Sequence, residues 1–322
     1  MIVLADVLAA ARRLRPYLSP TPLRAYPLLD AAVGHGIRVH VKHENHQPTG
    51  AFKVRNALSM VTALPEAARR RGLVAATRGN HGLGVAYAGQ ALGAPVTICV
   101  PHKNNPEKND AMRALGAELI EEGRDYDEAV VVADRLVSER GMTLVHSTND
   151  AGVIAGAGTM TLELLQQQPD IDALVIAVGG GSQAVGAIVV GRAFRPDLPI
   201  YAVQAERASA IHDSWHAGRA IPGASADTFA DGLATRGVYE MTFPALRAGL
   251  TGFITVTEAE LAAAVRVALR ATHSLVEGAG AGGLAGLCKL APALAGKRVG
   301  IVFSGGNIDE LTLRRILTGE IG

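Results

Sequence analysis

The sequence predicts an α/β protein whose strands form parallel sheets. Short apolar segments of strand length recur along the chain, and Ala-rich segments of helix length separate most of them. Parallel strands need such helical crossovers, and a sheet covered on both faces is made of continuous apolar strands. The predicted strands are residues 38–42, 73–76, 95–100, 118–120, 143–145, 173–177, 200–203, 253–256 and 298–303. The predicted helices include residues 82–92, 106–115, 126–140, 159–168, 182–192 and 258–272.

Composition excludes several classes of partner. Hydrophobic residues make up 48% of the 322 residues and the formal net charge is +1, which indicates neither nucleic acid nor an anionic membrane as a partner. Cys99 and Cys288 each lie in an apolar stretch, so we expect two buried thiols in a reducing compartment. The first residues do not resemble a signal peptide, and the apolar runs are too short to span a membrane. We therefore expect a cytoplasmic protein.

Lys53 is the most informative single residue. It follows a turn-and-cap sequence, residues 48–50, and begins an apolar pattern of helical spacing over residues 54–61. The positive end of the helix dipole favours the neutral form of a lysine amine at this position. A neutral amine is what Schiff-base chemistry requires. A solvated surface lysine is the alternative that position alone leaves open.

A glycine-rich turn lies between the predicted strand 173–177 and the predicted helix 182–192. It consists of Gly179, Gly180, Gly181, Ser182 and Gln183. Glycines expose backbone N–H groups and a helix N-terminus favours negative charge, so the turn predicts a phosphate site. A dinucleotide site is a weak alternative, because the next glycine has the wrong spacing and no acidic residue closes a following strand. A purely structural turn is the other alternative.

Two further predicted strands end in polar turns that contain glycine. Residues 79–81, Gly-Asn-His, follow the strand 73–76, and residues 304–307, Ser-Gly-Gly-Asn, follow the strand 298–303. In α/β proteins, ligands bind at the carboxyl ends of parallel strands, so we expect these turns to meet Lys53 in one crevice. Asn80 offers a donor and an acceptor that suit a phenolic oxygen. His81 by itself is more typical of a structural loop residue.

With these motifs the sequence resembles the fold-type II pyridoxal-phosphate enzymes. Within that class it is most similar to the threonine/serine dehydratase and serine racemase group. The matching segments occur in family order over nearly the whole chain: Lys42-x-Glu44, Pro48–Lys53, Gly79–His81, Gly179–Ser182, Ala230–Gly232 and Ser304–Asn307. The resemblance implies a tryptophan-synthase-β-like fold with two open parallel-sheet domains and the cofactor in the cleft between them. It implies a large domain of residues 1–52 and 147–322 and a small domain of residues 53–146. It further implies a homodimer or homotetramer, with no regulatory domain after residue 322.

The same resemblance implies roles for individual residues. Lys53 would form the Schiff base with pyridoxal 5'-phosphate. The residues expected around the cofactor ring are Phe52 on one face, Asn80 at the 3-oxygen, Ser304 at the pyridine nitrogen, and Gly232 and Glu277 nearby. The residues expected to hold the phosphate are Gly179, Gly180, Gly181, Ser182 and Gln183.

Ser304 favours elimination chemistry. A serine hydroxyl is too weak an acid to keep the ring nitrogen protonated, and a neutral ring is a poorer electron sink. Loss of a β-substituent is then favoured over transamination, with Lys53 as the general base at Cα. The predicted activity is dehydration of a β-hydroxy α-amino acid to a 2-oxo acid and ammonia. The candidate substrates are threonine, serine, or a larger analogue such as phenylserine or β-hydroxyaspartate. The alternatives are a β-replacement enzyme resembling cysteine synthase and a non-catalytic protein that binds pyridoxal phosphate.

Arg78 departs from the racemase pattern. Two residues before the position of Asn80, the racemases carry a serine that acts as an acid and base, and arginine stays protonated at any working pH. Racemase activity is therefore not expected. We count Arg78 with Lys53 and Ser304 among the candidate catalytic residues, where it would clamp a carboxylate or line an enlarged pocket. A solvated loop arginine is the alternative.

A divalent-cation site is not expected either. Where relatives carry acidic ligands, this sequence has Gln204 and Ala210. A neutral side chain lowers the negative charge that a hard cation needs. The nearby carboxylates of Glu206 and Asp213 are expected to lie in solvated surface turns.

Overall fold

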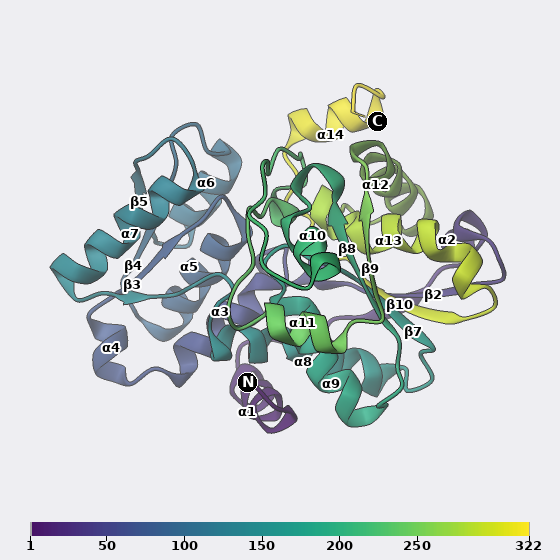
Figure 1. Ribbon diagram of the computed structural model, residues 1–322. Coiled ribbons are helices and arrows are strands. Elements are labelled where there is room, and N and C mark those ends of the chain that lie inside the picture. The colour runs from purple at the N-terminus through teal and green to yellow at the C-terminus, as the bar shows by residue number, and fades with distance from the viewer. Residues whose placement is uncertain (1, 322) are drawn as a thin grey trace.

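The computed structural model describes residues 2–321, which form two α/β lobes (Figure 1). The six-stranded sheet of the larger lobe has the order β1 (Leu23–Ala25), β2 (Arg38–Lys42), β10 (Arg298–Val302), β7 (Ala173–Ala177), β8 (Ile200–Ala205), β9 (Gly252–Val256). The four-stranded sheet of the smaller lobe has the order β5 (Glu118–Glu121), β4 (Val96–Val100), β3 (Leu73–Ala76), β6 (Thr143–Leu144). Neighbouring strands are parallel except for β1 and β2. The predicted α/β class is confirmed. The antiparallel edge strand β1 was not predicted, because three residues give no periodic signal.

Helices cover both faces of each sheet, and the side chains of the strands alternate between them. In β3, Leu73 and Ala75 pack into one core with α3 (Lys53–Ala63) and α5 (Asn80–Leu92), whereas Val74 and Ala76 pack into another with α7 (Tyr126–Arg140). The side chains of β7 alternate in the same way. Val175 packs into the core with α13 (Gly278–Leu290), and Ile176 packs into the core with α9 (Ser182–Phe194). The helices are α1 (Leu4–Leu14), α2 (Pro27–Val33), α3 (Lys53–Ala63), α4 (Glu66–Arg70), α5 (Asn80–Leu92), α6 (Pro106–Ala114), α7 (Tyr126–Arg140), α8 (Ala151–Gln167), α9 (Ser182–Phe194), α10 (Ala210–Ala217), α11 (Phe243–Gly249), α12 (Glu258–Thr272), α13 (Gly278–Leu290) and α14 (Glu310–Leu317).

Two expectations from the sequence are wrong in detail. The helix predicted at 159–168 begins eight residues earlier, at Ala151, because the Asp150 side chain accepts from the Val153 N–H at 2.9 Å and caps it. Cys99 is buried as predicted, but Cys288 is exposed. Small residues of α13 face the sheet, and Cys288 lies on the opposite side of the same helix.

The division into domains at residues 53 and 147 stays a prediction, and its outermost residues, 1 and 322, lie outside the described part. The strands of the smaller sheet all fall between residues 73 and 144. Within residues 2–321, no helix is long and apolar enough to cross a membrane. The same residues contain no group of three or more His, Cys, Asp or Glu side chains that could hold a metal ion.

Four charged side chains, three of them buried, join the beginning of α3 to the larger lobe. Arg55 donates to Glu44 at 2.8 and 3.0 Å, and to Glu163 of α8 at 2.7 and 2.8 Å. Lys42, at the end of β2, donates to Glu163 and to the carbonyl oxygen of Thr21, both at 2.7 Å. Lys42, Glu44 and Arg55 are at most 1% exposed. Two cations and two carboxylates thus compensate one another away from water.

The network fixes the place where α3 begins. Burial alone would raise the pKa of Glu44, but the charge and hydrogen bonds of Arg55 outweigh it, so the pKa of Glu44 lies below its usual value. Arg55 follows Lys53 by two residues on the same helix. The ion pairs of Arg55 therefore anchor the start of α3, and with it Lys53, to the turn after β2 and to α8 of the larger lobe.

Arg55→Met should lower the free energy of unfolding by about 3–5 kcal/mol, because the buried carboxylate of Glu44 loses its hydrogen-bonded cation, whereas Glu163 still pairs with Lys42. Urea unfolding of the purified protein measures this change. Arg135→Met is a matched control, since Arg135 forms a half-exposed pair with Glu122, and its loss should cost less than about 1 kcal/mol. Equal losses in the two variants would contradict the anchoring role of the network.

Candidate active site

A cavity of ≈ 340 Å³ lies between the lobes. Its lining includes the turns at the carboxyl ends of β3, β7 and β10, as expected for ligand sites in α/β proteins. The structure brings together all the residues that the sequence predicted for the site: Phe52, Lys53, Arg78, Asn80, Gly179, Gly180, Gly181, Ser182, Gln183, Gly232, Glu277 and Ser304. Their individual roles stay predictions.

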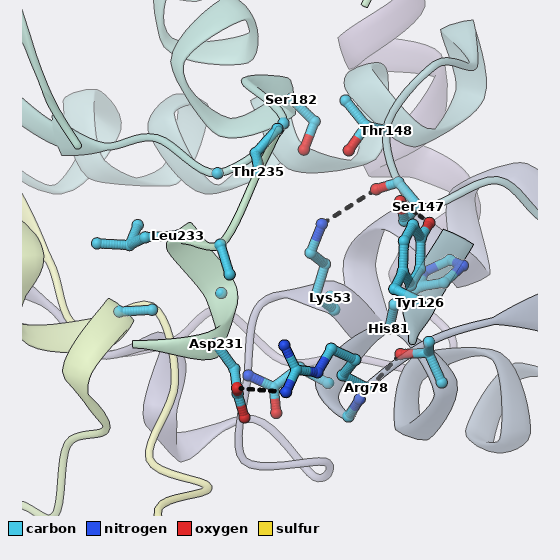
Figure 2. Close-up of a pocket in the computed structure, with 18 of the residues that line it drawn as sticks. Lys53, Arg78, His81, Tyr126, Ser147, Thr148, Ser182, Asp231, Leu233 and Thr235 are labelled. Atoms are coloured by element: carbon cyan, nitrogen blue, oxygen red, sulfur yellow. Dashed lines mark hydrogen bonds and ion pairs between the residues drawn. The ribbon is translucent and has the colours of Figure 1, made fainter. Parts of the chain in front are cut away.

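Lys53 is the first residue of α3, and its side chain lies in the cavity (Figure 2). The turn before it needs Gly50, which has a φ of 68°. The Phe52 N–H donates to the Ser304 carbonyl oxygen at 2.9 Å, which holds this turn to the end of β10. Lys53 Nζ donates to the carbonyl oxygen of Ser147 at 3.0 Å. Burial lowers the pKa of Lys53 to about 8. Burial thus adds to the helix dipole a second physical cause of a reactive amine, one that depends on tertiary packing.

The turn after β7 forms an anion cradle at the start of α9. A Cβ on Gly179 would lie 2.1 Å from the carbonyl oxygen of Gly232, and one on Gly180 would lie 2.3 Å from Thr148 Oγ1. Gly181 has a φ of 100°, which disfavours any residue with a side chain. No side chain can therefore cover the backbone N–H groups of this turn, and the N-terminal end of the helix favours an anion there.

Asn80 is held in one orientation by its neighbours. Its Oδ1 accepts from Asn307 Nδ2 at 2.8 Å, and its Nδ2 donates to Glu277 Oε1 at 2.5 Å. Burial raises the pKa of Glu277. Ser304 follows β10, and its Oγ lies 3.5 Å from the carbonyl oxygen of Ala279. The cavity therefore offers a fixed amide and a weakly bonded hydroxyl.

Arg78 lies at the cavity, although its side chain is half exposed. Its Nη2 lies 3.9 Å from Asp231 Oδ1 (Figure 2). The other oxygen of Asp231 accepts from Lys108 Nζ at 3.1 Å. Arg78 and Lys108 come from the smaller lobe and Asp231 from the larger one, so these three residues connect the lobes beside the cavity.

Several polar and aromatic lining residues were not assigned to the site from the sequence. They include Lys108, Asp125, Tyr126, Asp127, Ser147, Thr148, Asp231, Arg236 and Tyr239. Asp231 had a signal, since it lies in the motif at residues 230–232. The others reach the cavity through tertiary contacts, which no local sequence pattern predicts. Tyr126 at the start of α7, for example, has its hydroxyl 3.5 Å from Ser147 Oγ.

His81 is bonded to the backbone in the way a structural residue would be. Its Nε2 lies 2.7 Å from the carbonyl oxygen of Val145, so this nitrogen carries the proton. Burial lowers the pKa of His81 to about 3. The ring is therefore neutral near pH 7, and it helps to hold the start of α5.

Comparisons with known proteins identify relatives over nearly the whole chain. A family model described as pyridoxal-phosphate dependent enzyme matches residues 14–305. The L-threonine ammonia-lyase of Thermotoga maritima is 37% identical over 98% of this chain and 78% of its own length. The L-threo-3-hydroxyaspartate ammonia-lyase of a Pseudomonas species is 35% identical over 98% of both chains. The structure of maize serine racemase matches with a TM-score of 0.92 at 30% identity, covering 99% of this chain and 97% of that one.

The cavity fits an aldehyde that carries a phosphate, as pyridoxal 5'-phosphate does. The glycine turn leaves space that any Cβ would fill, and Gln183 Nε2 is buried there without a partner among residues 2–321. The Lys53 amine suits the aldehyde, and the Asn80 amide and Ser304 hydroxyl suit the polar atoms of the ring.

Gly179→Ala should weaken binding of pyridoxal 5'-phosphate about tenfold or more, because the new Cβ would overlap the backbone of Gly232 and displace the cradle. Absorbance titration of the cofactor-free protein measures the dissociation constant. Gly237→Ala is the matched control, since Gly237 also lines the cavity but has nothing within 4 Å of an added Cβ. Similar affinities for the two variants would show that the turn is not the phosphate site.

The pKa of Lys53 predicts how cofactor uptake depends on pH. Burial depresses the pKa, so the reactive neutral amine predominates above pH 8 and not only above the ordinary value of 10.5. The uptake rate should rise about tenfold per pH unit below pH 8 and level off above it. Free lysine, as the control, should react with a rate that keeps rising toward pH 10. The same continued rise in the protein would contradict the assignment of a depressed pKa to Lys53.

Proposed function

The chain belongs to the pyridoxal-phosphate-dependent enzyme family, and we propose that it is an ammonia-lyase that dehydrates β-hydroxy α-amino acids to 2-oxo acids and ammonia. Its cofactor is pyridoxal 5'-phosphate. One observation carries the proposal: the Lys53 amine, a glycine anion cradle and the Ser304 hydroxyl line the same cavity. The names of the two ammonia-lyase relatives support elimination over other reactions of the family.

Each side of the cavity would hold one part of the cofactor. The turn at residues 179–183 would bind the phosphate through backbone N–H groups, and Lys53 would bind the aldehyde carbon. Asn80 would hydrogen-bond the ring oxygen and Ser304 the ring nitrogen, while Phe52 packs against one face. Gly232 and Glu277 would lie near the ring as well.

When bound, the cofactor supplies an electron-withdrawing ring next to the Cα atom of the substrate. Lys53 Nζ would lie beside the Cα atom of the bound substrate and would remove the Cα proton as a general base. The electron pair of the broken Cα–H bond forms the Cα=Cβ bond while the Cβ–O bond breaks, and the hydroxyl leaves with a proton as water. The released enamine then takes up one water and yields the 2-oxo acid and ammonia.

Two residues would direct the reaction toward elimination. Ser304 cannot keep the ring nitrogen protonated, which disfavours transamination. Arg78 occupies the position of the racemase serine and cannot exchange a proton near pH 7, which disfavours racemisation even though a serine racemase shares the fold.

Two other functions would use the same cavity. A β-replacement enzyme would turn over only with a second nucleophile such as sulfide, and a storage protein would bind the cofactor and release no product. The proposal also includes a homodimer or homotetramer and a cytoplasmic location. The small-molecule substrate would be threonine, serine, or a larger analogue such as phenylserine or β-hydroxyaspartate.

Incubation with β-hydroxy amino acids should release ammonia and a 2-oxo acid in equal amounts without any added nucleophile. Lys53→Ala should lower this rate by at least about 10²–10⁴-fold, the usual contribution of a general base. Lys289→Ala, which removes an exposed lysine, is the matched control and should leave the rate unchanged. Turnover that requires sulfide, or a fully active Lys53→Ala variant, would refute the proposal.

A further inference from the structure

Arg78 has hydrogen-bond donors that the protein does not use. Across residues 2–321 its guanidinium makes no hydrogen bond, and its one ion pair, with Asp231, is 3.9 Å long. That distance is beyond hydrogen-bonding range. A guanidinium has five N–H donors in a planar arrangement that matches a carboxylate. The half-exposed side chain lines the cavity, so these donors are available to a bound molecule.

Asp231 does not need Arg78 to balance its charge. Lys108 Nζ donates to Asp231 Oδ2 at 3.1 Å, and the Lys108 side chain is only 9% exposed. Burial opposes the charge of Lys108, but Glu277 and Asp231 outweigh this effect and raise its pKa. Lys108 thus balances the charge of Asp231, and the positive charge of Arg78 is left without a hydrogen-bonded carboxylate among residues 2–321.

The other arginine of the cavity lining has its own partners. Arg236 Nη1 donates to Asp127 at 2.9 Å and to Asp125 at 3.4 Å. Lys53 bonds a backbone carbonyl and is committed to the cofactor. Arg78 is therefore the cation of the described lining that is best placed to accept an anionic group of the substrate.

The backbone around Arg78 is held in place. Thr77 Oγ1 accepts from the Gly79 N–H at 2.9 Å and from the Gly82 N–H at 3.3 Å. A Cβ on Gly79 would lie 2.5 Å from Lys108 Cδ, so the turn packs closely on that side chain. In Figure 2 the Arg78 side chain extends from this fixed turn toward Asp231, below Lys53.

We propose that Arg78 determines specificity by binding a carboxylate at the side-chain end of the substrate, which makes the preferred substrates β-hydroxy amino acids with a second carboxylate, such as 3-hydroxyaspartate. The inference rests on the proposed function and names the substrate class of the same site. A planar carboxylate can accept two N–H bonds from the guanidinium. The methyl group of threonine or the ring of phenylserine would use none of them.

Steady-state kinetics with three substrates tests this inference. The wild-type protein should have a higher kcat/KM for 3-hydroxyaspartate than for threonine or for phenylserine, whose side chain is large but uncharged. Arg78→Ala should lower the ratio of kcat/KM for 3-hydroxyaspartate to kcat/KM for threonine about 10- to 100-fold. Arg78→Lys keeps the charge but loses the planar donors, so its preference for 3-hydroxyaspartate should lie between the preferences of the wild-type protein and of Arg78→Ala. Arg113→Ala removes an arginine of similar exposure outside the cavity lining, and should leave the preference unchanged.

A binding measurement keeps the inference independent of turnover. L-Aspartate and L-2-aminobutyrate have no β-hydroxyl group to eliminate, so their dissociation constants report recognition alone. The wild-type protein should prefer aspartate, and Arg78→Ala should abolish that preference. Equal losses for both ligands would assign Arg78 to the α-carboxylate and overturn the inference, and so would a preference that survives in Arg78→Ala. Absence of ammonia from every substrate, together with an Arg78-dependent preference for aspartate, would refute only the proposed function.

Discussion

The buried ion pairs of Arg55 with Glu44 and Glu163 are the constraint on which the site depends. They fasten the first turn of α3 to the turn that follows β2 and to α8 of the larger lobe. Lys53 begins that turn, so its amine is fixed relative to the glycine cradle after β7 and to Ser304 after β10. A network of this kind adds little net stability compared with an apolar core, but removing Arg55 leaves the buried charge of Glu44 without its hydrogen-bonded cation. The main effect of the network is that it holds the Lys53 amine in one position.

The connection that residues 231–239 make between the lobes is of a different kind. Residues 231–239 line the cavity, and they contact the smaller lobe through Lys108 with Asp231 and Arg236 with Asp127. The second of these pairs is more than half exposed. Exposed ion pairs contribute little and are screened by salt. The Lys53 amine thus has a fixed base, while the contact of Arg236 with the smaller lobe is an ion pair that breaks at low cost.

The sequence predicted what local chemistry determines and missed what depends on tertiary packing. Apolar strands and glycine turns have periodic or compositional signals, so the sheets, the anion cradle and Lys53 could be located in advance. The edge strand β1 and the early start of α8 gave no such signal. Lys108 and Tyr126 reach the cavity only because their helices pack against it. Arg78 could be singled out from the sequence, but its unused donors are visible only in the structure.

A Schiff base between Lys53 and pyridoxal 5'-phosphate can be detected directly. The cofactor-loaded protein is reduced with borohydride, digested, and its peptides are analysed by mass spectrometry for a lysine bearing the cofactor. The account predicts the modification at Lys53. Modification at Lys108, the other lysine of the cavity lining, or at no lysine would contradict the account.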